Sequence, residues 1–451
     1  MDLSSRLRAI VRPGPSKTPV RELTYEPDTG YETTIAIDRV GDLLGGTVAR
    51  NAFGQCLIVE RRYESDRWHG GIRIGDCDLR SGEGLAVLDP GLEMRGRDAG
   101  PDAVAEALSR TVFIDLETTG LSGGAGTLAF LVGLGFFDLG AFQVRQFLLT
   151  SHAGERALLA AVAECFEDAD LIVTYNGKTF DVPVMETRWV FHRMEPALVG
   201  IPHFDMLHPA RRLWKLRPVE SAAGDDGGCR LSTLERALFG FRRVGDVPGG
   251  EIPGRFFQFL RSGDPRPLEP VLEHNRLDLV SLAAVTARAI RLAEEGVDAC
   301  RDASEALALG RVYERSGEVS RAEGCYRRAA EADDGDVKGE ALYRLGLRCR
   351  RERRFEEAAN VWRTLLTLGS THARTSPPAE ALRQFAAEAL AIHQEHRTRD
   401  YLAARELAMF ALEEMGDTSR RPRGKDGLRH RVARLDRKIT RERESSPLFW
   451  G

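Results

Sequence analysis

The sequence has little of what marks a secreted, disulfide-bonded or membrane-spanning protein. Its seven cysteines are an odd number and include no CxxC pair, which argues against a disulfide framework and against a zinc knuckle. No apolar run approaches the length of a membrane span, and the first residues lack the apolar core of a signal peptide. We therefore expect a reduced, cytoplasmic protein with no membrane partner.

The chain also lacks a strong excess of either charge. Its formal net charge is −4 over 451 residues, with 42% hydrophobic and 7% aromatic residues, as in ordinary globular proteins. The length allows two or three domains. A protein that coats nucleic acid through its overall charge is therefore disfavoured, whereas a local basic track is still possible.

The centre of the chain alternates strand and helix patterns. TVFIDLE at 111–117 predicts a buried strand, and the apolar runs on either side of Asp138–Gly140 predict a hairpin. LIVTY at 171–175 predicts a further strand, with helices over 154–167 and 180–194. This order predicts an α/β fold in which helices cover a mixed sheet.

After residue 298 the pattern becomes all-helical and contains a repeat. Leu309-Gly310, Ala322 and Tyr326 return 36 positions later as Leu345-Gly346, Ala358 and Trp362, and a weaker third copy follows. Such spacing resembles tetratricopeptide repeats, although a plain helical bundle is the alternative. The repeats could bind a protein partner.

Composition divides the chain into five expected regions. These are a flexible arm (1–28), a small β-rich element with a linker (29–109), the α/β domain (110–297), the helical repeats (298–415) and a basic tail (416–451). Within the tail, residues 418–443 contain 11 Lys/Arg against 3 Asp/Glu. This run is either a solvated helix, a disordered tail or a nucleic-acid contact.

Two carboxylates lie on the first strand of the α/β domain. Asp115 and Glu117 are two residues apart, so both side chains project from one face. Thr118 and the Thr-Gly-Leu after it end the strand where a substrate backbone could approach, which makes Thr118 a candidate contact. Ionised groups in such an apolar setting need a partner, and divalent metal is one that suits several carboxylates together.

Two further segments carry acidic candidates. Asp181 begins the helix after LIVTY and could be its N-cap or a metal ligand, with Asn176 a candidate substrate contact before it. His274 and Asp278 lie four residues apart on one face of a later helix. Asp278 could ligate metal, while His274 could orient or deprotonate an attacking water.

These blocks resemble the exonuclease motifs of the DEDD superfamily. DLETTGLSGGAGT, TYNGKTFDVPV and HNRLDLVSL are similar to the YprB-type ribonuclease H-like family, over about 110–295. The resemblance implies a ribonuclease H-like fold and 3′–5′ exonuclease activity on DNA or RNA. It also implies that Asp115, Glu117, Asp181 and Asp278 bind two Mg²⁺ or Mn²⁺ ions.

One position departs from the superfamily pattern. The better-known branches place a tyrosine four residues before the last aspartate, or a histidine five before it, whereas His274 occupies the tyrosine spacing. The identity of the general base is therefore left open, and Asn275 could share the role of positioning the attacking water. The alternative to a nuclease is a repeat scaffold that carries a degenerate nuclease fold.

Basic and glycine-rich segments near the motifs have less specific signals. Arg211, Arg212 and Lys215 follow Asp205 and are either a solvated helix face or contacts to a phosphate backbone. Asp205 itself is a weaker candidate for an acid behind the metal ligands. The glycine-rich 122–127 lacks the lysine of a phosphate loop and precedes a strand, so nucleotide binding is not expected there.

Overall fold

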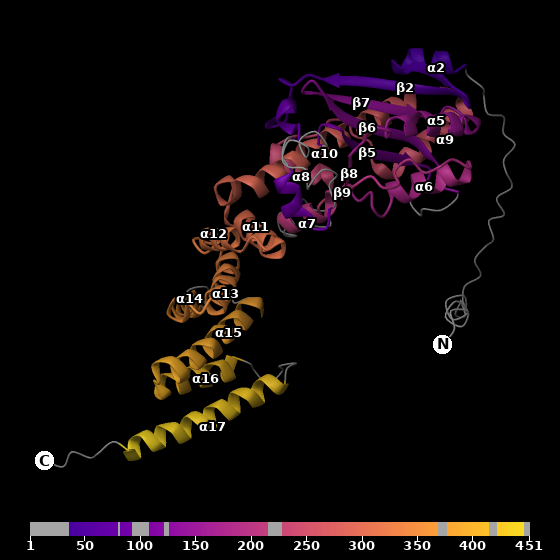
Figure 1. Cartoon of the computed structure of the whole chain (residues 1–451). Helices are drawn as coiled ribbons and strands as arrows, with labels where there is room; N and C mark the ends of the chain where they lie inside the picture. The colour runs from indigo at the N-terminus through magenta and orange to yellow at the C-terminus, as the bar shows by residue number, and fades with distance from the viewer. Residues whose placement is uncertain are drawn as a thin grey trace, which may run out of the picture.

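The computed structural model describes residues 36–79, 82–92, 108–120, 126–214, 228–368, 377–414 and 422–445. The arm expected over 1–28 lies outside these ranges. A sheet domain stands at one end of the molecule, and the C-terminal helices lead away from it in an extended row (Figure 1). Within the described ranges, no helix combines the length and the apolar character that a membrane crossing needs.

A seven-stranded mixed sheet forms the centre of the first domain. Its spatial order is β1-β2-β7-β6-β5-β8-β9, in which β5, β8 and β9 are parallel and the other neighbours are antiparallel. The strands are β1 (Thr47–Asn51), β2 (Gly54–Tyr63), β5 (Thr111–Thr118), β6 (Ala129–Asp138), β7 (Ala141–Leu148), β8 (Leu171–Thr174) and β9 (His203–Asp205). The expected mixed sheet is confirmed.

The hairpin expected around Asp138–Gly140 joins β6 to β7. Leu139 and Gly140 both have positive φ, 51° and 79°, the turn geometry that matches the twist of paired strands. The β-rich segment 29–109 differs from expectation, because β1 and β2 belong to the central sheet instead of forming a small element of their own. Long-range pairing of β2 with β7 causes this difference, since the local pattern shows strands but not their partners.

Helices cover both faces of the sheet. One face packs α5 (Glu155–Glu164), α6 (Asp181–Phe191) and α9 (Ile252–Ser262) against residues such as Ile114. The other face, which includes Phe113, packs α3 (Glu83–Leu88), α7 (Leu207–Trp214), α8 (Leu231–Phe239) and the long α10 (Glu269–Glu295). The side chains of β5 therefore alternate between two cores.

The C-terminal region consists of helices. They are α11 (Ala303–Ser316), α12 (Val319–Ala329), α13 (Gly335–Arg351), α14 (Phe355–Leu368), α15 (Pro377–His393), α16 (Tyr401–Glu414) and α17 (Pro422–Ser445). A Cβ at Gly310 would lie 2.6 Å from the Tyr326 ring, and one at Gly346 would lie 2.2 Å from Trp362 Nε1. The 36-residue spacing thus places glycine against an aromatic ring in two successive helix pairs.

The repeats join the sheet domain through a buried ion-pair cluster. Glu305 of α11, 2% exposed, accepts hydrogen bonds from Trp214 Nε1 at 2.7 Å and from Arg288 Nη2 at 3.0 Å. Trp214 belongs to α7 and Arg288 to α10, and the apolar core of that face runs on into α11. The first repeat is therefore packed directly against the sheet domain.

Candidate functional site

The first two candidate carboxylates lie on one side of β5. Asp115 and Glu117 are partly buried and follow the buried Phe113 on the same face. The pairing with β6 shifts register between Glu117 and Thr118, and the Thr118 hydroxyl donates to the Gly120 carbonyl oxygen at 2.9 Å. Thr118, expected to contact substrate, thus uses its hydroxyl in the turn that ends the strand.

A buried amide from α10 holds Asp115 in place. Asn275 donates through Nδ2 to Asp115 Oδ2 at 2.8 Å, and its Oδ1 accepts from Gln146 Nε2 at 2.8 Å. The amide lies over Gly133, the residue of β6 that pairs with both Asp115 and Gln146. A Cβ at Gly133 would come within 2.2 Å of Asn275 Oδ1, so only glycine leaves room for this contact.

Asp181 is the first residue of α6 and is only 7% exposed. Desolvation raises the pKa of Asp181 to about 7, although the backbone N–H groups of Asp181 itself and of Leu116 favour the charged form and lower the pKa. Phe180 occupies the N-cap position and no side chain caps the helix, so the N-cap alternative for Asp181 is wrong.

Asp205 anchors the loop that precedes Asp181. At the end of β9, its carboxylate accepts from the backbone N–H of Asn176 at 2.8 Å and of Lys178 at 3.1 Å. Asn176 has a left-handed φ of 72°, and its side-chain oxygen accepts from Thr179 Oγ1 at 3.0 Å. Asn176, expected to contact substrate, therefore shapes the loop with both its backbone and its amide oxygen.

Asp278 lies in a cluster of charged side chains. His274 Nε2 is 3.3 Å from Asp278 Oδ2, as the four-residue helical spacing predicts. Arg243 Nη2 donates to Asp278 Oδ1 at 2.5 Å, and its guanidinium also binds the buried Glu235 at 2.7 and 3.0 Å. Hydrogen bonds to Glu235 and the charge of Asp278 raise the pKa of Arg243, although desolvation opposes them.

The other ring nitrogen of His274 also faces a carboxylate. Asp246 Oδ1 lies 2.6 Å from His274 Nδ1. Ionised carboxylates only accept hydrogen bonds, so both nitrogens donate when the ring is protonated. Arg243, Glu235 and Asp246 were not found by sequence reasoning, because they lie on a separate helix and loop with no motif of their own.

The four acidic candidates share one electrostatic environment. Burial, then the charges of Asp278, Glu117 and Asp181, raise the pKa of Asp115 well above its usual value. Burial, Asp278 and Asp181 do the same to Glu117. Within the described ranges, no lysine or arginine pairs with Asp115, Glu117 or Asp181. The charges of the four predicted residues therefore influence one another, and three of them, Asp115, Glu117 and Asp181, have no cationic partner in the described ranges.

Oxygen donors with uncompensated charge suit a divalent cation such as Mg²⁺ or Mn²⁺. As the side chains stand, however, no three acidic, histidine or cysteine residues of the described ranges are arranged to hold an ion. Asp278 is the candidate ligand that pairs with an arginine. The oxygen donors of these residues thus fit a divalent cation. For Asp278 to bind one, its ion pair with Arg243 would have to open.

The basic candidates lie on or after α7. Arg212 donates to the Leu88 carbonyl oxygen of α3 at 3.2 Å, and desolvation lowers its pKa. Arg211 is exposed, whereas Lys215 lies outside the described residues, as does most of the glycine-rich 122–127. The structure thus directs Arg212 to a structural contact and leaves Arg211 available to solvent.

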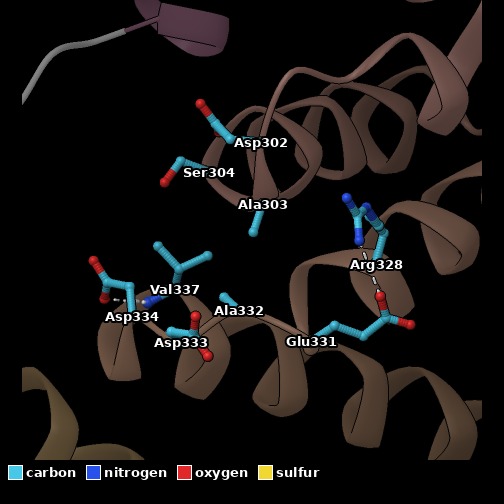
Figure 2. Close-up of a pocket in the computed structure, with 9 residues that line it drawn as sticks. All are labelled: Asp302, Ala303, Ser304, Arg328, Glu331, Ala332, Asp333, Asp334 and Val337. Carbon is cyan, nitrogen blue, oxygen red and sulfur yellow. Dashed lines mark hydrogen bonds and ion pairs between the residues drawn. The ribbon is translucent and has the colours of Figure 1, made fainter.

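A recess of about 360 Å³ lies in the repeats, between α11, α12 and α13 (Figure 2). Three of its four acidic side chains have local partners. Asp302 caps α11 by accepting from the Glu305 N–H, Asp334 caps α13, and Glu331 pairs with Arg328 at 3.1 Å. The recess is therefore a seam between repeats, and it contains none of the predicted site residues.

Comparisons with known proteins agree with this architecture. Residues 112–290 match the RNase_H superfamily, and residues 306–338 match a tetratricopeptide repeat. The chain is 32% identical over 390 residues to the protein YprB of Bacillus subtilis (strain 168), an alignment that covers 85% of this chain and 86% of YprB.

A distant structural likeness also exists. The family B DNA polymerase from the archaeon Pyrobaculum calidifontis aligns with a TM-score of 0.29 and 12% sequence identity. The alignment covers 46% of this chain and 29% of the polymerase. A similarity this low carries no argument about function.

Proposed function

Because the chain belongs to the YprB-type family of ribonuclease H-like proteins with C-terminal tetratricopeptide repeats, we propose that it is a nuclease that removes nucleotides from the 3′ end of a nucleic acid. One observation carries the proposal. Asp115, Glu117, Asp181 and Asp278 come from three separate segments, and their mutual repulsion contributes to the raised pKa values of Asp115 and Glu117. A purely structural cluster would be expected to contain a compensating cation for each buried carboxylate.

We propose that these four residues hold two Mg²⁺ or Mn²⁺ ions. When bound, such ions supply Lewis-acid stabilisation of charge on the phosphate and a more acidic water. The rest of the site is pre-positioned by neutral and buried groups. Asn275 fixes Asp115, so this carboxylate does not need to be ordered by the ligand.

His274 is the proposed proton acceptor. With Nδ1–H donated to Asp246, the ring keeps its orientation and Nε2 carries the exchangeable proton beside Asp278. Loss of that proton would leave Nε2 as a base at the edge of the cluster. Asn275 is fully buried and bonded to Asp115 and Gln146, so it supports a carboxylate and does not share the role of His274.

The competing proposal is a repeat scaffold with a degenerate nuclease fold. The ion pair between Arg243 and Asp278 favours it, because the guanidinium bonds to an oxygen of a proposed metal ligand. Calorimetric titration with Mn²⁺ separates the two. The nuclease predicts binding that weakens at least tenfold in Asp181→Asn, whereas the scaffold predicts no binding in the wild-type protein.

The direction and the substrate of cleavage need a second experiment. Single- and double-stranded DNA and RNA oligonucleotides, labelled at either end, would be incubated with the protein and Mg²⁺ or Mn²⁺. A 3′ exonuclease releases labelled mononucleotide at once from 3′-labelled strands and produces a shortening ladder from 5′-labelled strands. Internal cuts in a circular single strand would contradict an enzyme that begins at a free end.

A further inference from the structure

Within the basic tail, residues 422–445 form helix α17, which is fixed to the repeats by one buried acid. Glu395, in the π-helical turn Gln394–Thr398, is 1% exposed. Arg431, Arg434 and Lys438 of α17 reach it at 2.7, 2.8 and 2.9 Å. On another side of α17, Leu428 and Leu435 are buried. These contacts therefore fix which side of α17 faces the repeats and which side faces solvent.

This orientation leaves a row of cations facing solvent. Arg437 and Arg441 are exposed, and neither forms an ion pair with a residue that the structure describes. At about 100° per residue, they project from the side of α17 next to Arg434 and Lys438. Arg434 remains 43% exposed and Lys438 32% exposed despite their bonds to Glu395. We name Arg434, Arg437, Lys438 and Arg441 the basic stripe.

The charge of the basic stripe exceeds what the protein neutralises. Of its four cations, only Arg434 and Lys438 bond to a carboxylate, and both use the same buried Glu395, so a net charge of about three remains along the helix. Residues 434 and 441 are seven positions apart, about 10 Å along the axis. A nucleic-acid strand presents one phosphate per about 3.4 Å of helix rise, so about three phosphates match this length.

We propose that the basic stripe binds the phosphate backbone of the strand whose end enters the carboxylate cluster, an inference that rests on the proposed function. A membrane surface is the less suitable partner, because Leu428 and Leu435 are buried and the described side chains of α17 present no exposed large apolar residue to insert. Figure 1 places α17 at the end of the molecule opposite to β5. Only a strand long enough to follow the repeats can reach both.

The experiment compares two double variants with the same change in charge. Arg437→Gln/Arg441→Gln alters the stripe, and Arg429→Gln/Arg443→Gln alters cations about a third of a turn round the same helix. Binding of a fluorescent single strand of thirty nucleotides would be measured by anisotropy over a salt series, with EDTA present to prevent cleavage. Circular dichroism would confirm that both variants retain the wild-type helix content.

For the stripe variant, log K is expected to fall less steeply with log salt than for wild type. The magnitude of the slope should decrease by about one to two, as two lost phosphate contacts require. The control variant should leave the slope within about 0.5 of wild type. Equal slopes for the two variants would overturn the proposal, as would preferential binding of anionic phosphatidylserine vesicles over the oligonucleotide. Wild-type hydrolysis of a six-nucleotide strand tests the proposed function separately, because such a strand is too short to span both places.

Discussion

Replacing Gly133 with alanine would test the contact on which the Asp115 geometry depends. Gly133 lies on β6 between Asp115 and Gln146, and the Asn275 amide packs against its Cα. A methyl group there would come within 2.2 Å of Asn275 Oδ1 and 2.8 Å of its Cγ. Because ordinary contacts begin near 3.4 Å, the amide would have to move by roughly 1 Å or more.

The expected cost follows from what that movement breaks. The Asn275 amide would lose its 2.8 Å bonds to Asp115 and Gln146, and each buried polar group left unpaired costs about 1–3 kcal/mol. Overpacking of the strand costs a similar amount. We expect Gly133→Ala to lower the free energy of unfolding by about 3–5 kcal/mol and to weaken Mn²⁺ binding, since Asp115 loses its support.

A double-mutant cycle with Asn275→Ala makes the test specific. The three atoms closest to the added methyl all belong to the amide, so once it is absent the double variant should be no less stable than Asn275→Ala alone. Urea denaturation followed by circular dichroism gives the four free energies. Gly254→Ala on α9, where a Cβ meets nothing within 4 Å, is the control in which no clash arises and no loss of stability is expected. Strictly additive costs, or a Gly133→Ala protein as stable as wild type, would refute the reasoning.

Three further changes probe other parts of the molecule. Arg243→Met leaves Glu235 buried without its cation and should cost about 3–5 kcal/mol in thermal unfolding, and an unchanged melting temperature would contradict this. Gly346→Ala should destabilise the repeats by about 1–3 kcal/mol because its methyl meets an indole, whereas Gly324→Ala on α12, with no neighbour within 4 Å, should not. Although desolvation opposes them, bonds from α17 lower the pKa of Glu395 to about 2. A carboxylate whose pKa is lower in the folded state stabilises the fold at pH values above its unfolded pKa, near 4.5. At pH 7 the free energy of unfolding of wild type should therefore exceed that of Glu395→Gln by at most about 3 kcal/mol. This difference should shrink as the pH falls from 4.5 towards 2. A difference that is constant over this range in urea denaturation would contradict the assignment.

Short-range patterns predicted much of the fold and of the carboxylate positions. The turn at Asp138–Gly140, the shared face of Asp115 and Glu117 and the 36-residue spacing all depend on residues close in sequence, and the structure reproduces each. Pairing between distant segments could not be predicted this way. The place of β1 and β2 in the central sheet is set by the pairing of β2 with β7.

The contacts that hold the site residues in place were likewise not predictable from short-range patterns. Asn275 reaches Asp115 across 160 positions of sequence, and only Gly133 makes that approach possible. The position of Gly133 within the apolar run LVGLGFF could have indicated this contact, because a glycine inside a strand often marks a close approach by another element. Arg243 gave no such signal, since its partners Glu235 and Asp278 come together only in the folded chain.

The central claim is that the carboxylate cluster hydrolyses phosphodiester bonds with the help of divalent cations. Its most direct test is the rate of mononucleotide release from a 3′-labelled single strand as Mn²⁺ is added to EDTA-treated protein, for wild type, Asp115→Asn and Asp138→Asn. Asp138 is the exposed last residue of β6 and is the matched control for loss of one carboxylate. We predict a rate that rises with Mn²⁺ in wild type and Asp138→Asn and falls at least a hundredfold in Asp115→Asn. Equal rates in all three proteins, or release that continues in EDTA, would contradict the account.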